Sequence, residues 1–240
     1  MSNANLLGRN LLPAGLLAGA IVLLGTSAMP RGDGGKLELE EARLFFEYNA
    51  SDSDLGVHVF LDGEDWKKMK IFNPQEKKLF DVKGSGPYAE FGMTELFFEG
   101  AEPSLKDVPL DEFLELFPEG EYEFEGQTVD GEEIEGESEL THAIPDGPAV
   151  QVTKGPGDLL VVSWMAVDSA PPGFPVQRVE VVGYQVIVDD NFQVNLPSSV
   201  LSLTLPAEYV ASLEPGEHEL EVLAVEEGGN QSITETDFEK

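Results

Sequence analysis

Apolar and polar side chains alternate along much of this chain, in short runs separated by Gly, Pro, Asn and Asp. An extended strand points successive side chains to opposite faces, so this alternation predicts strands with one buried face. Turn signals at intervals of roughly ten residues are typical of an all-β protein. In the first half, strands are expected at residues 44–48, 57–61, 66–72, 79–82, 95–99, 121–126 and 132–140.

Two features of the first half specify local structure more closely. The segments 57–61 and 66–72 are joined across Asp62-Gly63, which predicts a β-hairpin between them. Residues 109–117 depart from the alternation, because a proline is followed by acidic residues and by apolar side chains at helical spacing. This pattern predicts a helix of about two turns inside the otherwise β-rich segment.

The second half predicts strands at residues 159–164, 179–189, 200–205 and 217–225. Their apolar side chains form stripes that two facing sheets would bury. A Pro- and Gly-rich stretch at residues 142–156 separates the halves, and we place a boundary near Gly147. The expected domains are therefore residues 37–146 and 147–240. The stripes are Val182, Tyr184, Val186 and Val188; Leu201, Leu203 and Leu205; and His218, Leu220, Val222 and Ala224.

The N-terminus has the order of a secretory signal peptide. Arg9 is the only charge before an apolar run at residues 11–24, and small residues follow up to Ala28. The run is shorter than the roughly 20 residues that a membrane-spanning helix needs. We therefore expect residues 1–28 to be a signal peptide, residues 29–36 a linker, and the mature protein to be secreted or periplasmic.

Composition adds a strong acidic signal, with 46 acidic against 14 basic side chains and a net charge of −32. This charge disfavours nucleic acids and anionic membrane surfaces as partners, because both are bound by clustered Lys and Arg. The acidity fits either a solvated surface or divalent-cation binding. The absence of cysteine excludes disulfides and cysteine-ligated metals.

Four segments of the second half resemble a fibronectin type III domain over residues 148–240. They are Leu159–Trp164, Gly183–Val186, Leu213–Gly216 and Leu220–Val225. The resemblance implies a β-sandwich with Trp164 in its core. His218 stands where such sandwiches have a corner tyrosine, and a ring nitrogen would have to replace the tyrosine hydroxyl.

The first half repeats part of this pattern, since residues 116–125 parallel residues 213–221 and place Tyr122 at the corner position. We therefore expect an all-β fold of two immunoglobulin-like or fibronectin type III-like β-sandwiches, the first diverged and carrying the short helix. Residues 94–120 also resemble part of an uncharacterised family of exported bacterial proteins, a resemblance that implies no function.

The best candidate site is an acidic segment at residues 49–56. Asp52 and Asp54 alternate with a following Gly56, and Asn49 adds a side-chain oxygen. Converging oxygen ligands and a sharp turn are what Ca²⁺ requires, with Asp62 as a further candidate ligand. The alternative is an ordinary Asp- and Ser-rich turn.

Motifs for catalysis are absent from the sequence. The three histidines show no triad spacing, and no nucleophile elbow, phosphate loop or zincin helix occurs. We therefore expect a non-catalytic binding or structural module of the cell envelope or extracellular space, with an unknown protein or polysaccharide partner and calcium as the one candidate cofactor. The alternative function is an extracellular carbohydrate-processing hydrolase or an accessory module.

Overall fold

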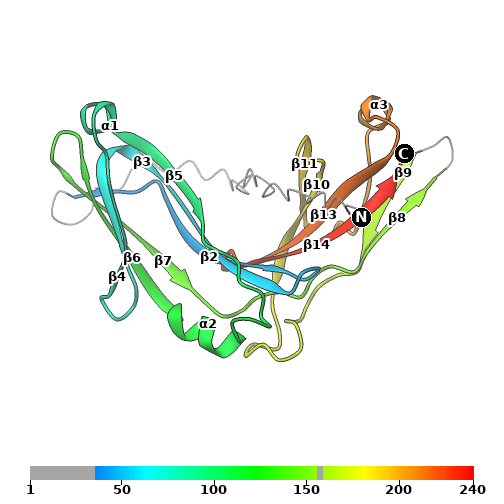
Figure 1. Cartoon of the computed structure of the whole chain (residues 1–240), viewed down its shortest axis with the longest axis horizontal. Coiled ribbons are helices and arrows are strands. Elements are labelled where there is room, and N and C mark those ends of the chain that lie inside the picture. Colours follow the sequence, from blue (N-terminus) through cyan, green and yellow to red (C-terminus); the bar gives the residue numbers. More distant parts are fainter. Residues whose placement is uncertain (1–35, 156–158) are drawn as a thin grey trace, which may run out of the picture.

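The computed structural model describes residues 36–155 and 159–240, so the predicted signal peptide lies outside the described residues. The described chain is all-β, with three short helices (Figure 1). The strands are β1 (Leu37–Glu38), β2 (Glu41–Asn49), β3 (Asp54–Phe72), β4 (Lys78–Lys83), β5 (Met93–Glu99), β6 (Gly120–Thr128), β7 (Glu133–Leu140), β8 (Val150–Lys154), β9 (Leu160–Trp164), β10 (Val181–Val188), β11 (Phe192–Pro197), β12 (Ser202–Thr204), β13 (Glu217–Glu226) and β14 (Gln231–Glu239). The helices are α1 (Pro87–Glu90), α2 (Leu110–Leu116) and α3 (Ala207–Ser212).

The first sandwich is built around the long strand β3. The first part of β3 pairs with β2 and β5, and its second part pairs with β4 and β6. From β6 the sheet continues through β7 to β1. The predicted hairpin between residues 57–61 and 66–72 is therefore wrong. Both segments belong to one strand, whose register shifts between Asp62 and Trp66, and residues 57–61 pair instead with β2. Gly63 lies close to the core here, because a Cβ at this position would be 3.0 Å from Leu39 Cδ2 and 3.4 Å from Ile134 Cδ1.

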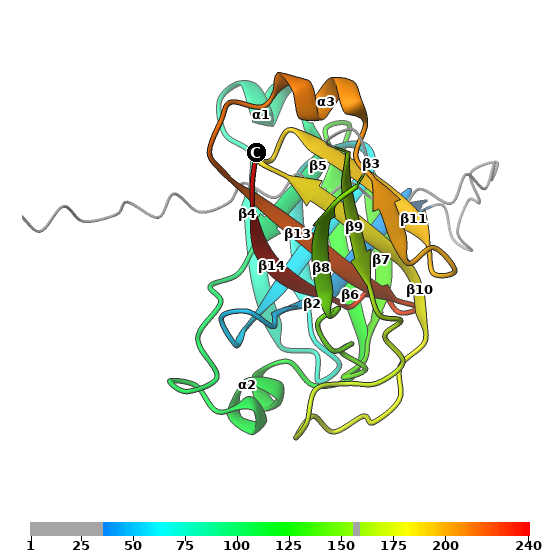
Figure 2. The ribbon, with the colours of Figure 1, turned by 90° about the vertical axis from the view of Figure 1, so that its right-hand side faces the viewer.

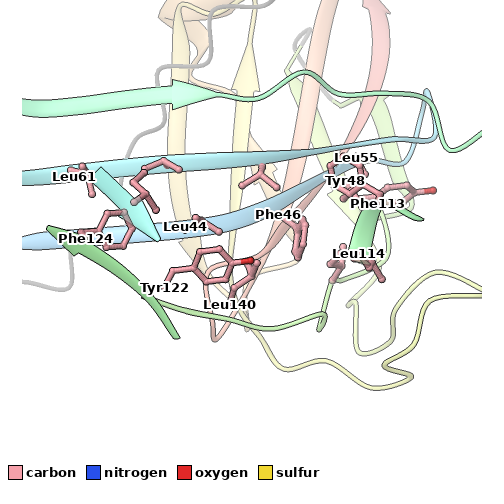
Figure 3. Close-up of a cluster of buried hydrophobic side chains, with 14 of the residues drawn as sticks. Leu44, Phe46, Tyr48, Leu55, Leu61, Phe113, Leu114, Tyr122, Phe124 and Leu140 are labelled. Carbon is pink, nitrogen blue, oxygen red and sulfur yellow. The ribbon is translucent and has the colours of Figure 1, made fainter. Parts of the chain in front are cut away.

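Alternate residues of β2 and β3 point into the first core. Leu44, Phe46 and Tyr48 of β2 lie on the side that faces Tyr122 and α2, as Figure 3 shows. Helix α2 covers this side with Phe113 and Leu114, which confirms the predicted helix. Trp66 is fully buried here and therefore serves as a core residue of the first sandwich.

The second sandwich has a sheet of β8, β9 and β12 in front of a sheet formed by β14, β13, β10 and β11 (Figure 2). Trp164 is 5% exposed and contacts the Tyr184 ring, with the ring centroids 5.4 Å apart. The core position expected for Trp164 is thus confirmed. The predicted stripes of β10 and β13 supply much of the rest of this core, although Val182 at the start of the first stripe is exposed. Leu160 and Val162 of β9, Leu205 and Phe238 of β14 complete it.

The two sandwiches share a local arrangement. In each, a short helix after a proline, Pro109 or Pro206, is followed by a long strand, β6 or β13, that pairs in antiparallel fashion with the next strand of the chain. That strand begins after a glycine at positive φ, Gly120 at 129° and Gly216 at 140°, a backbone conformation that favours glycine. The chain is therefore two immunoglobulin-like, fibronectin type III-like β-sandwiches, the first of them diverged, as predicted.

The sandwiches are joined edge to edge. Strand β14 pairs in parallel with β2, so the larger sheet of the second sandwich continues into the first (Figure 1). The segment between β9 and β10 is rich in proline at residues 170–175 and also crosses this junction. Its Phe174 packs in the first core, with its ring 5.2 Å from that of Tyr48. Gly147 lies between Ala50 and Thr234, where a Cβ would be 2.3 Å from the Ala50 methyl group. The domain boundary near Gly147 stays a prediction.

Candidate functional site

The junction between the sandwiches is fixed by one buried asparagine. Asn230 is 1% exposed, and its Oδ1 accepts a hydrogen bond of 2.9 Å from the Phe46 backbone N–H. Its Nδ2 donates to the carbonyl oxygens of Thr141, at 2.9 Å, and Ala143, at 3.3 Å. A buried amide with both ends satisfied fixes the geometry around it, so Asn230 holds β2 and the end of the first sandwich against β14.

The predicted calcium loop is the turn of the β2–β3 hairpin. Asn49 Oδ1 accepts hydrogen bonds from the backbone N–H groups of Ser51 and Asp52, and Asn49 Nδ2 donates to Glu235 Oε1 over 2.6 Å. Ser53 closes the turn at a φ of 59°, and its N–H donates to the Asn49 carbonyl. The oxygen that was expected to bind Ca²⁺ therefore already caps two backbone donors.

The two other candidate aspartates lie at opposite ends of one hairpin. Asp54 pairs with Asn49 beside the turn, whereas Asp62 pairs with Glu41 at the far end. Eight residues of strand place Asp62 roughly 26 Å from the loop, so the structure does not bring it to the other three. Burial, with Glu102 nearby, raises the pKa of Asp54 to about 6. Whether Asn49, Asp52 and Asp54 bind calcium stays a prediction.

A second group of ligand atoms lies on the face of β2 and β3 that points away from the first core. Glu47, His58 and Glu102 each offer one atom within 4.8 Å of the others. His58 Nε2 is 3.3 Å from Glu102 Oε1 and 3.8 Å from Glu47 Oε1. Sequence reasoning missed this group, because Glu102 comes from a loop 44 residues after His58.

Three features position this group. Glu47 lies directly opposite Gly56 in the β2–β3 ladder, and the absent side chain of Gly56 leaves the space that Glu102 occupies. A Cβ at residue 56 would lie 2.6 Å from Glu102 Cγ. The loop that carries Glu102 is held against β3 by backbone hydrogen bonds from Gly100 to Val57 and from Leu55 to Pro103.

The electrostatics of this group are those of buried charge. The side chains of His58 and Glu47 are 0% and 4% exposed. Burial raises the pKa of Glu47 to about 7, and Glu102 adds to the shift. Burial also disfavours the charged form of His58, but its hydrogen bond with Glu102 and the charge of Glu47 outweigh burial and raise its pKa. A cation among these groups would relieve the repulsion between the carboxylates.

A purely acidic group lies across the junction on the second sandwich. Glu221 and Glu235 are direct neighbours on β13 and β14, and Glu219 completes a set of carboxylates within 4.8 Å. Burial raises the pKa of Glu221 to about 8, with contributions from the charges of Glu219 and Glu235. The junction therefore concentrates carboxyl groups on both sides of the β2–β14 pairing.

The corner histidine behaves as the sequence predicted. His218 Nε2 lies 2.7 Å from the carbonyl oxygen of Glu214, and Nδ1 lies 2.5 Å from Asp189 Oδ2. The hydrogen bond with Glu214 and then that with Asp189 raise the pKa of His218. The residue thus ties down the loop before β13 and has a structural role.

In the part of the chain that the structure describes, no helix combines the length and the apolar character needed to cross a membrane.

Comparisons with known proteins do not show a family for this chain. No family model matches it, and no curated protein matches it. Among solved structures, a two-domain fibronectin type III segment of chicken tenascin is 13% identical, with a TM-score of 0.29 over 84% of this chain and 99% of that one. The spore cortex lytic enzyme SleM of Clostridium perfringens is 18% identical, with a TM-score of 0.30 over 41% of this chain and 28% of that one. A 1.5-MDa bacterial ice-binding adhesin is 12% identical, with a TM-score of 0.28 over 82% and 63%. Scores this low define neither a family nor a function.

Proposed function

We propose that this chain is a secreted, non-catalytic binding or structural module of the cell envelope or extracellular space, in which two β-sandwiches act as one rigid body. The observation that carries the proposal is the parallel β2–β14 pairing, which replaces a flexible linker by a continuous sheet. The resemblance of residues 94–120 to exported bacterial proteins and the predicted signal peptide support an extracellular location.

Rigidity follows from the chemistry of the junction. Asn230 connects three backbone segments while buried, and Ser232 Oγ donates to the Asp146 carbonyl over 2.8 Å. On the turn side, the Glu235 backbone N–H donates to Ser51 Oγ over 2.9 Å. Phe174 adds apolar contact with the first core. Independent rotation of the sandwiches would break all of these contacts at once, so their relative orientation is fixed.

A fixed orientation suits a module that presents surfaces at a set distance. Parallel pairing also covers one edge of each sandwich, and covered edges do not recruit other strands. The strong negative charge disfavours nucleic acids and anionic membranes, which leaves a protein or a polysaccharide as the partner. Calcium dependence through Asn49, Asp52 and Asp54 is part of this proposal.

The experiment measures the distance between the sandwiches by spin labelling. The chain has no cysteine, so Glu95→Cys and Ser199→Cys place one label on each sandwich without background. We expect a single narrow distance distribution. Adding Asn230→Ala should broaden it, whereas adding Asn191→Ala, at an exposed asparagine, should not. A broad distribution in the parent double-cysteine protein would contradict the rigid-body proposal.

A further inference from the structure

We propose that Glu47, His58 and Glu102 form a binding site for a divalent transition-metal ion, with Zn²⁺ as the ion that their chemistry fits best. The three side chains come from β2, β3 and the loop after β5, and their ligand atoms lie within 4.8 Å of one another. Zn²⁺ is bound by imidazole nitrogen and carboxylate oxygen, and three such protein ligands leave one position open.

The distances fit a shared ion better than a direct ion pair. Charge-assisted N–H···O bonds are about 2.7–2.9 Å long, whereas the Nε2 of His58 lies 3.3 Å from Glu102 and 3.8 Å from Glu47. Two ligand atoms at tetrahedral positions, each about 2.0–2.1 Å from Zn²⁺, are about 3.4 Å apart. Both carboxylates are directed at the same ring nitrogen, and one N–H donates well to only one of them.

The surroundings of the three ligands are those of a preformed site. Glu47 Oε2 accepts a hydrogen bond from Gln231 Nε2, which orients the carboxylate and leaves Oε1 toward His58. The absent Cβ of Gly56 makes room for Glu102. His58 Nδ1 is buried and has no hydrogen-bond partner among the described residues, so Nε2, which faces both carboxylates, is the ring nitrogen that would bind the ion.

The donor set distinguishes between metals. Ca²⁺ takes six to eight hard oxygen ligands, which a buried site with one nitrogen and two carboxylates does not supply. Imidazole suits Zn²⁺, Cu²⁺, Fe²⁺ and Ni²⁺. The side chain of Glu102 is 26% exposed, whereas those of His58 and Glu47 are almost fully buried. The ion would therefore enter from the side of Glu102, where the fourth position is open to water.

The experiment measures Zn²⁺ binding to the untagged full chain in competition with a chromophoric chelator. We expect one tightly bound Zn²⁺ per chain, which millimolar Ca²⁺ and Mg²⁺ do not displace. Substitutions of outer-shell residues typically weaken metal binding about 10–100-fold. Glu102 would be a direct ligand, so Glu102→Gln should weaken Zn²⁺ binding by at least this factor. Glu112→Gln, at an exposed position of α2, is the matched control and should bind as the wild type does.

Three outcomes would overturn the proposal. They are equal Zn²⁺ affinity in Glu102→Gln and the control, displacement of the ion by Ca²⁺, or loss of binding in Glu235→Gln with retention in Glu102→Gln, which would assign the ion to the acidic group on β13 and β14. A second measurement needs no variant. Co²⁺ added to the wild-type chain should give the intense visible absorption of a four-coordinate site, and the weak spectrum of six-coordinate Co²⁺ would contradict it.

Discussion

Tyr122 and His218 occupy the same corner in the two sandwiches, and the ring of each forms a hydrogen bond with the carbonyl oxygen four residues earlier. Tyr122 donates to Pro118 over 3.0 Å, and His218 Nε2 lies 2.7 Å from Glu214. Two different side chains, a tyrosine and a histidine, therefore make the same corner hydrogen bond in the two sandwiches. In both cases the bond fixes the loop between the short helix and the strand that follows it.

The corner bond in the first sandwich should contribute measurably to stability. Tyr122→Phe removes the hydroxyl and leaves the Pro118 carbonyl without its donor, so we expect a loss of about 1–2 kcal/mol in the free energy of unfolding. Urea denaturation measures this loss. Tyr88→Phe, at a ring that is 63% exposed, is the control and should change stability little. Equal effects of the two substitutions would show that the corner bond adds nothing.

The core position of Trp164 leads to a larger effect. Trp164→Ala empties a large aromatic site between the sheets of the second sandwich, for which the usual cost is about 3–5 kcal/mol. Denaturant unfolding followed by circular dichroism measures it. Met165→Ala removes a neighbouring side chain that is 71% exposed and should cost far less. A loss below about 1 kcal/mol for Trp164→Ala would place that ring outside the core.

How much of this could be predicted depended on which physical signal each element carries. Strands with one buried face, such as β6 with Tyr122 and Phe124 buried between exposed glutamates, were identified because alternation reports burial directly. The hairpin across Asp62-Gly63 was wrong because local turn chemistry does not reveal that β2 is a better partner for residues 57–61. Strand β14 was missed because its Thr and Glu residues resemble a loop, and its burial arises from pairing with both β13 and β2.

The candidate sites were predictable from the sequence only where their residues lie close together along the chain. Asn49, Asp52 and Asp54 are adjacent in sequence, and the structure keeps them together at one turn. Glu102 reaches His58 only because a loop folds along β3 and Gly56 leaves space for it. Contacts of this kind depend on the tertiary fold, so composition and residue spacing do not predict them.

Stability should fall as the pH rises. Burial raises the pKa of Glu221 in the folded chain to about 8, whereas the ordinary value is 4.5, so the folded state holds the proton more tightly than the unfolded state. Its contribution is therefore complete below about pH 4.5 and is lost as the pH rises to about 8. Glu47 shifts in the same direction.

The test of this pH dependence is a pair of glutamine variants. Glu221→Gln removes the buried charge, so we expect it to be more stable than the wild type at pH 8 and to lose less stability between pH 5 and pH 8. Glu217→Gln, at an exposed position of the same strand, should keep the wild-type dependence. Thermal melts across that range measure both. Identical pH profiles for the two variants would show that Glu221 stays ionised in the folded chain.

Calcium binding at the β2–β3 turn leads to the last prediction. If Asn49, Asp52 and Asp54 hold Ca²⁺, the ion stabilises the folded state by RT ln(1 + [Ca²⁺]/Kd), about 2.7 kcal/mol at a hundred times Kd. Screening of the net charge of −32 also stabilises the chain, but Na⁺ at equal ionic strength reproduces screening and does not fill a site.

We therefore expect wild-type protein to melt at a higher temperature in millimolar CaCl₂ than in NaCl of equal ionic strength, and the double variant Asp52→Asn/Asp54→Asn to lose that difference. Asp62→Asn is the control for the loss of a carboxylate, because Asp62 lies at the far end of the hairpin, and it should keep the difference. If calcium gives the wild type no advantage over sodium, or gives the double variant the same advantage, the segment is a hairpin turn stabilised by Asn49 alone.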